Sequence, residues 1–125
     1  MAKADTAYSS ARALLRLGDV DGVANRAYYA MFDAARAALL ASGASVELDI
    51  GRTHSGLIGA FGNHLVKNGP VPKEVGRCLN RAHEIRLLAD YTGNSVELAD
   101  IKEMLEQAAS FVAFMRAKFM PDETQ

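Results

Sequence analysis

The chain has 125 residues, of which 50% are hydrophobic, and its formal net charge is −1 at pH 7. This length predicts one domain with a sizeable core. The near-neutral charge excludes a strong overall attraction to nucleic acid but leaves room for a local basic groove.

The single cysteine, Cys78, excludes a disulfide framework within the chain and fits a reducing compartment. No apolar run approaches the roughly 20 residues that span a bilayer, and the N-terminus does not resemble a signal peptide, so we expect a cytoplasmic protein without membrane contact.

Two helices are predicted in the first third of the chain. The first covers about residues 4–17, with Asp5 as its expected N-cap and Gly18 as its stop. The second covers about residues 20–42 and stops at a glycine. Alanines fill much of its apolar arc, which also includes Tyr28. Because small side chains let a neighbouring helix approach closely, we expect the second helix to be central.

The opposite face of the second helix carries polar and charged side chains around one tyrosine. A solvated surface with local ion pairs is one interpretation, because each such pair contributes little to stability. A contact surface for a ligand is the other interpretation, since an aromatic ring among charges is a suitable binding group. This face consists of Asn25, Arg26, Tyr29, Asp33 and Arg36.

A third helix is expected to begin near Thr53 or His54, after an irregular stretch at residues 44–52, and to end at an Asn-Gly-Pro sequence. His54 is then either a capping or core-edge histidine or a catalytic group. Three glycines recur at every third position of this helix, which fits either a tight helix crossing or a segment that moves. They are Gly56, Gly59 and Gly62.

Two further helices complete the chain. The fourth starts at about Pro72 and ends at Thr92-Gly93, and the fifth starts at a cap on Asn94 or Ser95 and runs to about Met120. Apolar residues keep the helical spacing in both, which predicts two buried stripes.

The order of these elements predicts the fold class. Five helices with short connections indicate an all-α protein, an antiparallel up-and-down helical bundle of four to five helices. We expect a single domain over residues 1–125, with its core at about residues 4–120 and a tail at residues 121–125.

One arginine lies on the apolar face of the fourth helix. At 100° per residue, Arg86 falls inside the apolar stripe, and His83 and Asp90 flank it on one edge. A guanidinium stays charged and is costly to bury unless it is paired. Either Asp90, one turn further on, pairs with Arg86, or this face lines a polar groove.

Several kinds of chemistry find no support in the sequence. There is no glycine-rich phosphate loop, and the spacing of His54, His64 and His83 is not that of a zinc site. Cys78 shares its helix face with apolar residues, so a catalytic thiol is not expected. We therefore predict no metal site and no cofactor.

Three collinear segments resemble the HEPN domain family, in its small stand-alone branch. The first resembles the central HEPN helix and is residues 25–40, NRAYYAMFDAARAALL. The second is residues 52–58, RTHSGLI, followed by Phe61. The third resembles the Arg-x-x-x-Asp-Tyr segment of that branch and is residues 86–91, RLLADY.

The resemblance implies both an assembly and an activity. HEPN proteins are helical bundles, usually homodimers, and many accompany a minimal nucleotidyltransferase (MNT) in a toxin–antitoxin pair. Active members are metal-independent ribonucleases with an Arg-x(4–6)-His motif at the dimer interface. Arg86 matches the motif arginine. The motif histidine is missing, because no histidine follows His83 and the matching region holds Asp90 and Tyr91.

Two hypotheses from different classes follow. In the first, the protein is a dimeric binding or interaction module that pairs with an MNT protein and binds nucleotide or RNA around Arg86, with Tyr91, Tyr29 and Asn25 as further ligand contacts. In the second, it is a ribonuclease toxin. The candidate catalytic residues are then Arg86, Asp90, His83 and His54. The incomplete motif favours the first hypothesis, and a helical protein without a ligand is a third, plainer interpretation.

Overall fold

The computed structural model describes residues 1–43, 53–91 and 97–121, with the side chains of residues 90 and 91 left out. All its regular elements are helices, and the described residues contain no strand. The predicted all-α bundle is therefore confirmed. The elements are α1 (Ala2–Arg16), α2 (Val20–Ser42), α3 (His54–Phe61), the π-helix η2 (Gly62–Lys67), α4 (Lys73–Tyr91) and α5 (Leu98–Phe119).

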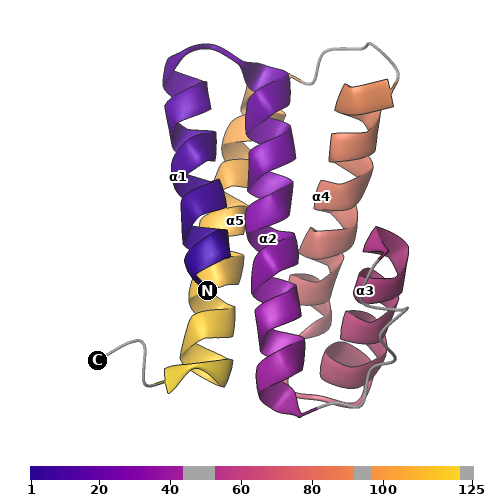
Figure 1. The fold of residues 1–125 in the computed structure, drawn as a ribbon. Coiled ribbons are helices and arrows are strands. Elements are labelled where there is room, and N and C mark those ends of the chain that lie inside the picture. The colour runs from indigo at the N-terminus through magenta and orange to yellow at the C-terminus, as the bar shows by residue number, and fades with distance from the viewer. Residues whose placement is uncertain (44–52, 92–96, 122–125) are drawn as a thin grey trace.

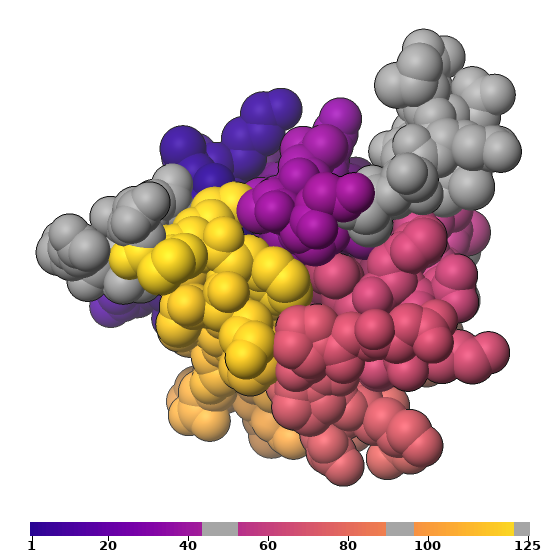
Figure 2. Space-filling view, turned by 90° about the horizontal axis from the view of Figure 1, so that it is seen from below, coloured from indigo at the N-terminus to yellow at the C-terminus, as the bar shows by residue number. Residues whose placement is uncertain are grey.

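The four long helices run alternately up and down, and the short α3 stands beside the lower half of α4 (Figure 1). Helix α2 is central, because it contacts α1, α3, α4 and α5. Seen along the bundle axis, the ends of α2 and α5 and the segment from α3 into α4 meet at one end (Figure 2). This arrangement brings the start of α3 against the faces of α2 and α4.

Local hydrogen bonds fix several helix ends. The side chain of Asp19 accepts a hydrogen bond from the backbone N–H of Gly22 at 3.0 Å and caps α2. At the other end of α2, Gly43 adopts a left-handed conformation with φ of 75°, which only glycine adopts at little cost. The hydroxyl of Thr53 accepts from the N–H of Gly56 at 2.9 Å and caps α3. These caps place His54 in the first turn of α3.

Two predicted helix starts are wrong. Helix α1 begins at Ala2, so Asp5 lies in its first turn and forms an ion pair with Arg116 of α5 instead of capping the helix. Helix α5 begins at Leu98 with Glu97 as its N-cap, which is later than the caps predicted at Asn94 and Ser95. The first difference arises because an acidic side chain is also favoured inside a first turn, near the positive end of the helix dipole.

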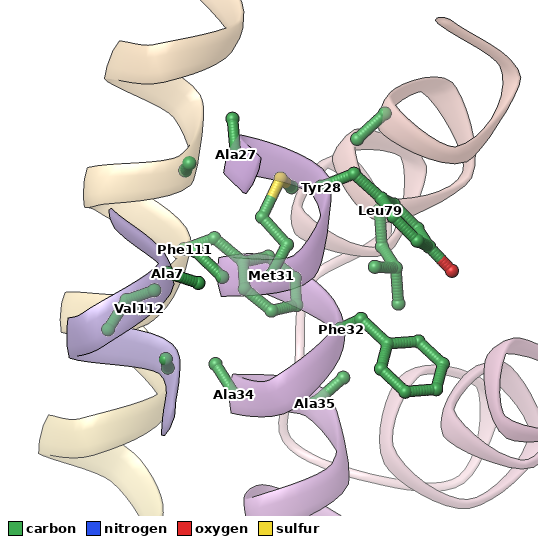
Figure 3. Close-up of a cluster of buried hydrophobic side chains, with 14 of the residues drawn as sticks. Ala7, Ala27, Tyr28, Met31, Phe32, Ala34, Ala35, Leu79, Phe111 and Val112 are labelled. Carbon is green, nitrogen blue, oxygen red and sulfur yellow. The ribbon is translucent and has the colours of Figure 1, made fainter. Parts of the chain in front are cut away.

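The core combines many alanines of α1 and α2 with large side chains from α2, α3, α4 and α5, such as Met31, Phe61, Leu79 and Met104. Alanines at the α1–α2 contact are fully or almost fully buried, which lets the two helices lie close together. Met31 points toward Phe111 of α5, whereas Phe32 and the hydroxyl of Tyr28 point to the other side of α2 (Figure 3). One side of α2 thus faces the apolar interior, and the other side carries the Tyr28 hydroxyl.

Two of the three glycines predicted on the third helix, Gly59 and Gly62, do not lie at a tight helix crossing. A Cβ atom at Gly59 or Gly62 would meet no atom within 4 Å. The close approach lies at Gly76 instead, where a Cβ would come within 2.9 Å of Val66 Cγ2. The stretch predicted to be irregular, residues 44–52, lies outside the described residues. None of the described helices combines the length and apolarity that a membrane crossing requires.

Candidate functional site

A cluster of aromatic and basic side chains forms where α2, α3 and α4 meet. Helix α2 contributes Tyr28 and Tyr29, α3 contributes His54, and α4 contributes His83 and Arg86. His83 and Arg86 are three residues apart and therefore lie on the same face of α4. We call these five residues the His–Arg cluster. Tyr28 is fully buried, and the other four are partly exposed.

The rings of the cluster are packed on one another. The imidazoles of His54 and His83 are stacked, with centroids 6.1 Å apart and an interplanar angle of 12°. The ring of Tyr28 lies 5.6 Å from His54 and 5.3 Å from His83. Both tyrosine rings face the guanidinium of Arg86, whose Cζ lies 5.7 Å from the Tyr28 centroid and 5.5 Å from that of Tyr29. These distances are within the range of cation–π attraction, so the aromatic rings help to position Arg86.

One hydrogen bond ties the core to the site. The Tyr28 hydroxyl lies 2.6 Å from Nδ1 of His54, which is its only partner among the described residues. Burial raises the pKa of Tyr28, so the phenol stays protonated. A buried hydroxyl that donated to no acceptor would lose free energy. We therefore infer that Tyr28 donates to Nδ1 and that neutral His54 carries its proton on Nε2.

His83 has a related arrangement. Its Nδ1 atom is buried and has no hydrogen-bond partner among the described residues. A proton on Nδ1 would be a buried donor without an acceptor, which is rarer in proteins than an under-satisfied acceptor. The neutral tautomer with the proton on Nε2 avoids this, so we infer that His83, like His54, carries its proton on Nε2 when it is neutral.

Electrostatics favour the neutral form of both histidines. Burial lowers the pKa of His54, and the positive charge of Arg86 and the neighbouring His83 lower it further. Burial also lowers the pKa of His83, again with a contribution from Arg86, while Glu84 acts in the opposite direction. Arg86 therefore sets a positive potential at both rings. The cluster offers one permanent cation and two neutral N–H donors, a combination suited to a phosphate oxygen.

Four of the residues singled out in the sequence come together here: His54, His83, Arg86 and Tyr29. Asn25 lies one helical turn before Tyr29 and is half-buried, but it takes no part in the described contacts of the cluster. The side chains of Asp90 and Tyr91 lie outside the described residues, so the pairing of Arg86 with Asp90 stays a prediction.

Sequence reasoning missed the role of Tyr28, which it placed only in the apolar arc. The available signal was chemical, because a buried tyrosine hydroxyl usually has a hydrogen-bond partner. Phe32 was missed as well, although its ring lies 4.6 Å from the imidazole of His54 and covers it. Within the described ranges, no three His, Cys, Asp or Glu residues are grouped so that they could hold a metal ion.

The bundle and its cluster define a small helical domain with an arginine–histidine site between helices, and comparison with known proteins gives its family. The family model for the HEPN domain matches residues 1–118, so the chain belongs to the HEPN family. A UPF0332 protein of Gloeobacter violaceus is 37% identical over 114 residues, which cover 90% of this chain and 86% of that protein.

Two further relatives extend the comparison. A UPF0332 protein of Thermotoga maritima is 38% identical over 104 residues, or 82% of this chain and 74% of that protein. A protein of Methanocaldococcus jannaschii, named as a candidate toxin, is 33% identical over 92 residues, or 74% of this chain and 64% of that protein.

The lowered pKa values of the two histidines predict a pH dependence of stability. As the pH falls below the ordinary histidine value of 6.5, the unfolded chain binds protons that the folded chain does not yet bind. The free energy of unfolding should therefore decrease from about pH 7.5 to about pH 5.5. Denaturant titrations at both pH values measure this decrease, which should be smaller in the double variant His54→Gln/His83→Gln. The control His64→Gln changes a histidine outside the cluster, and an equal pH dependence in all three proteins would contradict the prediction.

Proposed function

We propose that this HEPN protein binds RNA or nucleotide through the His–Arg cluster. The observation that carries the proposal is the convergence of Arg86 with two imidazoles whose pKa values are lowered by burial and by Arg86 itself. A guanidinium with adjacent N–H donors matches the oxygens of a phosphate group. The ring of Tyr29 adds an aromatic face on which a base can stack. Asn25 and Tyr91 are further proposed ligand contacts, next to Tyr29 along α2 and at the end of α4.

The protonation states favour binding over cleavage. Metal-independent cleavage of RNA needs one group to take the proton of the 2′-hydroxyl and another to protonate the leaving oxygen. In His54 the Nδ1 lone pair is used by Tyr28, and the neutral Nε2–H is a poor acid. His83 presents the same neutral N–H group. Near neutral pH the cluster therefore supplies positive charge and hydrogen-bond donors but lacks an acid–base pair.

We also propose a biological role and two binding partners for the protein. Membership of the HEPN family, together with the candidate-toxin name of the relative from Methanocaldococcus jannaschii, supports a role in a toxin–antitoxin pair. The partner that we propose is a minimal nucleotidyltransferase, as the family resemblance implies. A homodimer with the Arg86 helix at its interface would bring two copies of the cluster together.

Ribonuclease activity is the second candidate function. It is favoured by the stacking of two histidines beside an arginine, because protonation of one imidazole would create the missing acid. Asp90 is the proposed alternative base, although its ordinary pKa of about 3.9 makes it a poor acid near neutral pH. If this function holds, cleavage should increase as the pH falls toward the pKa values of the histidines.

The proposal makes a direct prediction for Arg86. In EDTA and near neutral pH, the purified protein should bind single-stranded RNA with little or no cleavage. Arg86→Met should weaken binding by about tenfold or more, because a charge-assisted hydrogen bond contributes about 1.5–3 kcal/mol. Fluorescence anisotropy with labelled RNA measures the affinity, and gel analysis of the same samples measures cleavage.

The matched control is Arg77→Met, which removes an exposed arginine from the same helix. Thermal unfolding of both variants tests the fold. A severe loss of stability in Arg86→Met alone would assign this arginine a structural role. Robust cleavage that vanishes in Arg86→Met would favour the ribonuclease, and a wild-type protein that neither binds nor cleaves RNA would contradict both candidates.

The proposed homodimer predicts a mass that light scattering can measure. At micromolar concentration the wild-type protein should have twice the mass of one chain. Leu88, on the same helix as Arg86, is a large hydrophobic side chain that is 54% exposed, and we expect the proposed interface on this helix to cover it, so Leu88→Glu should shift the equilibrium toward the monomer. The control Leu17→Glu changes a leucine that is 80% exposed at the end of α1 and should stay dimeric. A monomeric wild-type protein would rule out a composite site.

A further inference from the structure

A furrow runs along the seam between α1 and α2, on the outside of the bundle. It consists of two neighbouring hollows of about 350 Å³ and about 390 Å³, whose linings share Ala2, Lys3 and Asp33. Its lining includes four alanines, Ala2, Ala4, Ala7 and Ala37. Its rim carries longer polar side chains from both helices.

The charge of the furrow differs from that of the whole chain. Three exposed cations line it, Lys3, Arg26 and Arg36, against one carboxylate, Asp33. The chain as a whole has a net charge of −1. Burial raises the pKa of Asp33 although Lys3 and Arg36 both act to lower it. The furrow is thus a local basic surface with one half-buried carboxyl group that can accept a hydrogen bond.

The furrow adjoins the His–Arg cluster through one side chain. Tyr29 lines the first hollow, and its ring also lies 5.6 Å from His54 and 5.5 Å from the guanidinium of Arg86. Arg26, Tyr29, Asp33 and Arg36 recur at three- or four-residue spacing, so they form one face of α2. This face extends over about 15 Å of α2 from Arg26 to Arg36, at 1.5 Å of rise per residue, and Tyr29, which adjoins the cluster, lies within that length.

We propose that the α1–α2 furrow holds the segment of a single-stranded RNA that flanks the phosphate bound at the His–Arg cluster. This inference rests on the function proposed above. A base next to that phosphate stacks on Tyr29, and the flanking phosphates meet Arg26 in one direction and Lys3 and Arg36 in the other. A single strand fits because stacking on a side chain requires an unstacked base, which a duplex does not offer. Asp33 can accept a hydrogen bond from a 2′-hydroxyl or an exocyclic amino group.

RNA ligands of different length distinguish binding at the furrow from binding at the His–Arg cluster. A dinucleotide, with one phosphodiester, should occupy the cluster alone, whereas a 12-nucleotide strand should also fill the furrow. The double variant Arg26→Gln/Arg36→Gln should therefore weaken binding of the 12-mer about tenfold or more and leave dinucleotide binding unchanged. The salt dependence of 12-mer binding should also become shallower, by about 0.7 in logarithmic slope for each phosphate contact that is lost.

The control variant is Arg12→Gln/Arg81→Gln, which removes the same charge from exposed helical positions that do not line the furrow. If the control and the furrow variant weaken 12-mer binding equally, the furrow proposal is overturned while the cluster proposal stands. If the wild-type protein binds neither ligand, both proposals fail. If the furrow variant instead changes the mass measured by light scattering, the furrow is an interface between copies of the chain and the RNA assignment is overturned.

Discussion

The Tyr28 hydroxyl is the single polar atom on which the described site depends. Its ring is fully buried at the centre of α2, so the hydroxyl must find a partner inside the protein, and leaving it without one would cost about 1–3 kcal/mol. The partner is Nδ1 of His54 at the start of α3. This bond therefore couples the packing of α3 against α2 to the orientation of an imidazole. It also sets which nitrogen of His54 carries the proton.

Arg86 completes the arrangement from α4. Its charge lies over the faces of Tyr28 and Tyr29, and, together with the larger effect of burial, it lowers the pKa of both histidines and so favours their neutral form. The resulting cluster combines a permanent cation, two N–H donors and an aromatic face. Such a combination is better suited to holding a phosphate than to transferring protons. This HEPN domain lacks the histidine of the Arg-x(4–6)-His motif. Because its cluster can hold a phosphate but is poorly suited to proton transfer, we propose that it binds its ligand without cleaving it.

The fold could be predicted from the sequence in large part, because the period of the apolar residues specifies helices and their buried faces. The same period placed Arg86 inside an apolar stripe and thereby marked the polar site. The meeting of His54 with His83 could not be derived, since it depends on how α3 packs between two helices that are distant in sequence. The hydrogen bond between Tyr28 and His54 could not be predicted for the same reason. The helix start at Ala2 was missed because an acidic residue such as Asp5 is favoured within a first turn as well as at the N-cap.

Nitrogen NMR of the imidazole rings tests the central claim most directly, because the chemical shifts of Nδ1 and Nε2 distinguish the two neutral tautomers from the imidazolium. At pH 7 we expect His54 and His83 to be neutral, with their protons on Nε2, and we expect addition of a dinucleotide to shift the Nε2 signals of both. In Tyr28→Phe the tautomer of His54 should no longer be fixed. A wild-type His54 with its proton on Nδ1, or Nε2 signals that do not respond to the dinucleotide, would contradict a phosphate site built on this hydrogen bond.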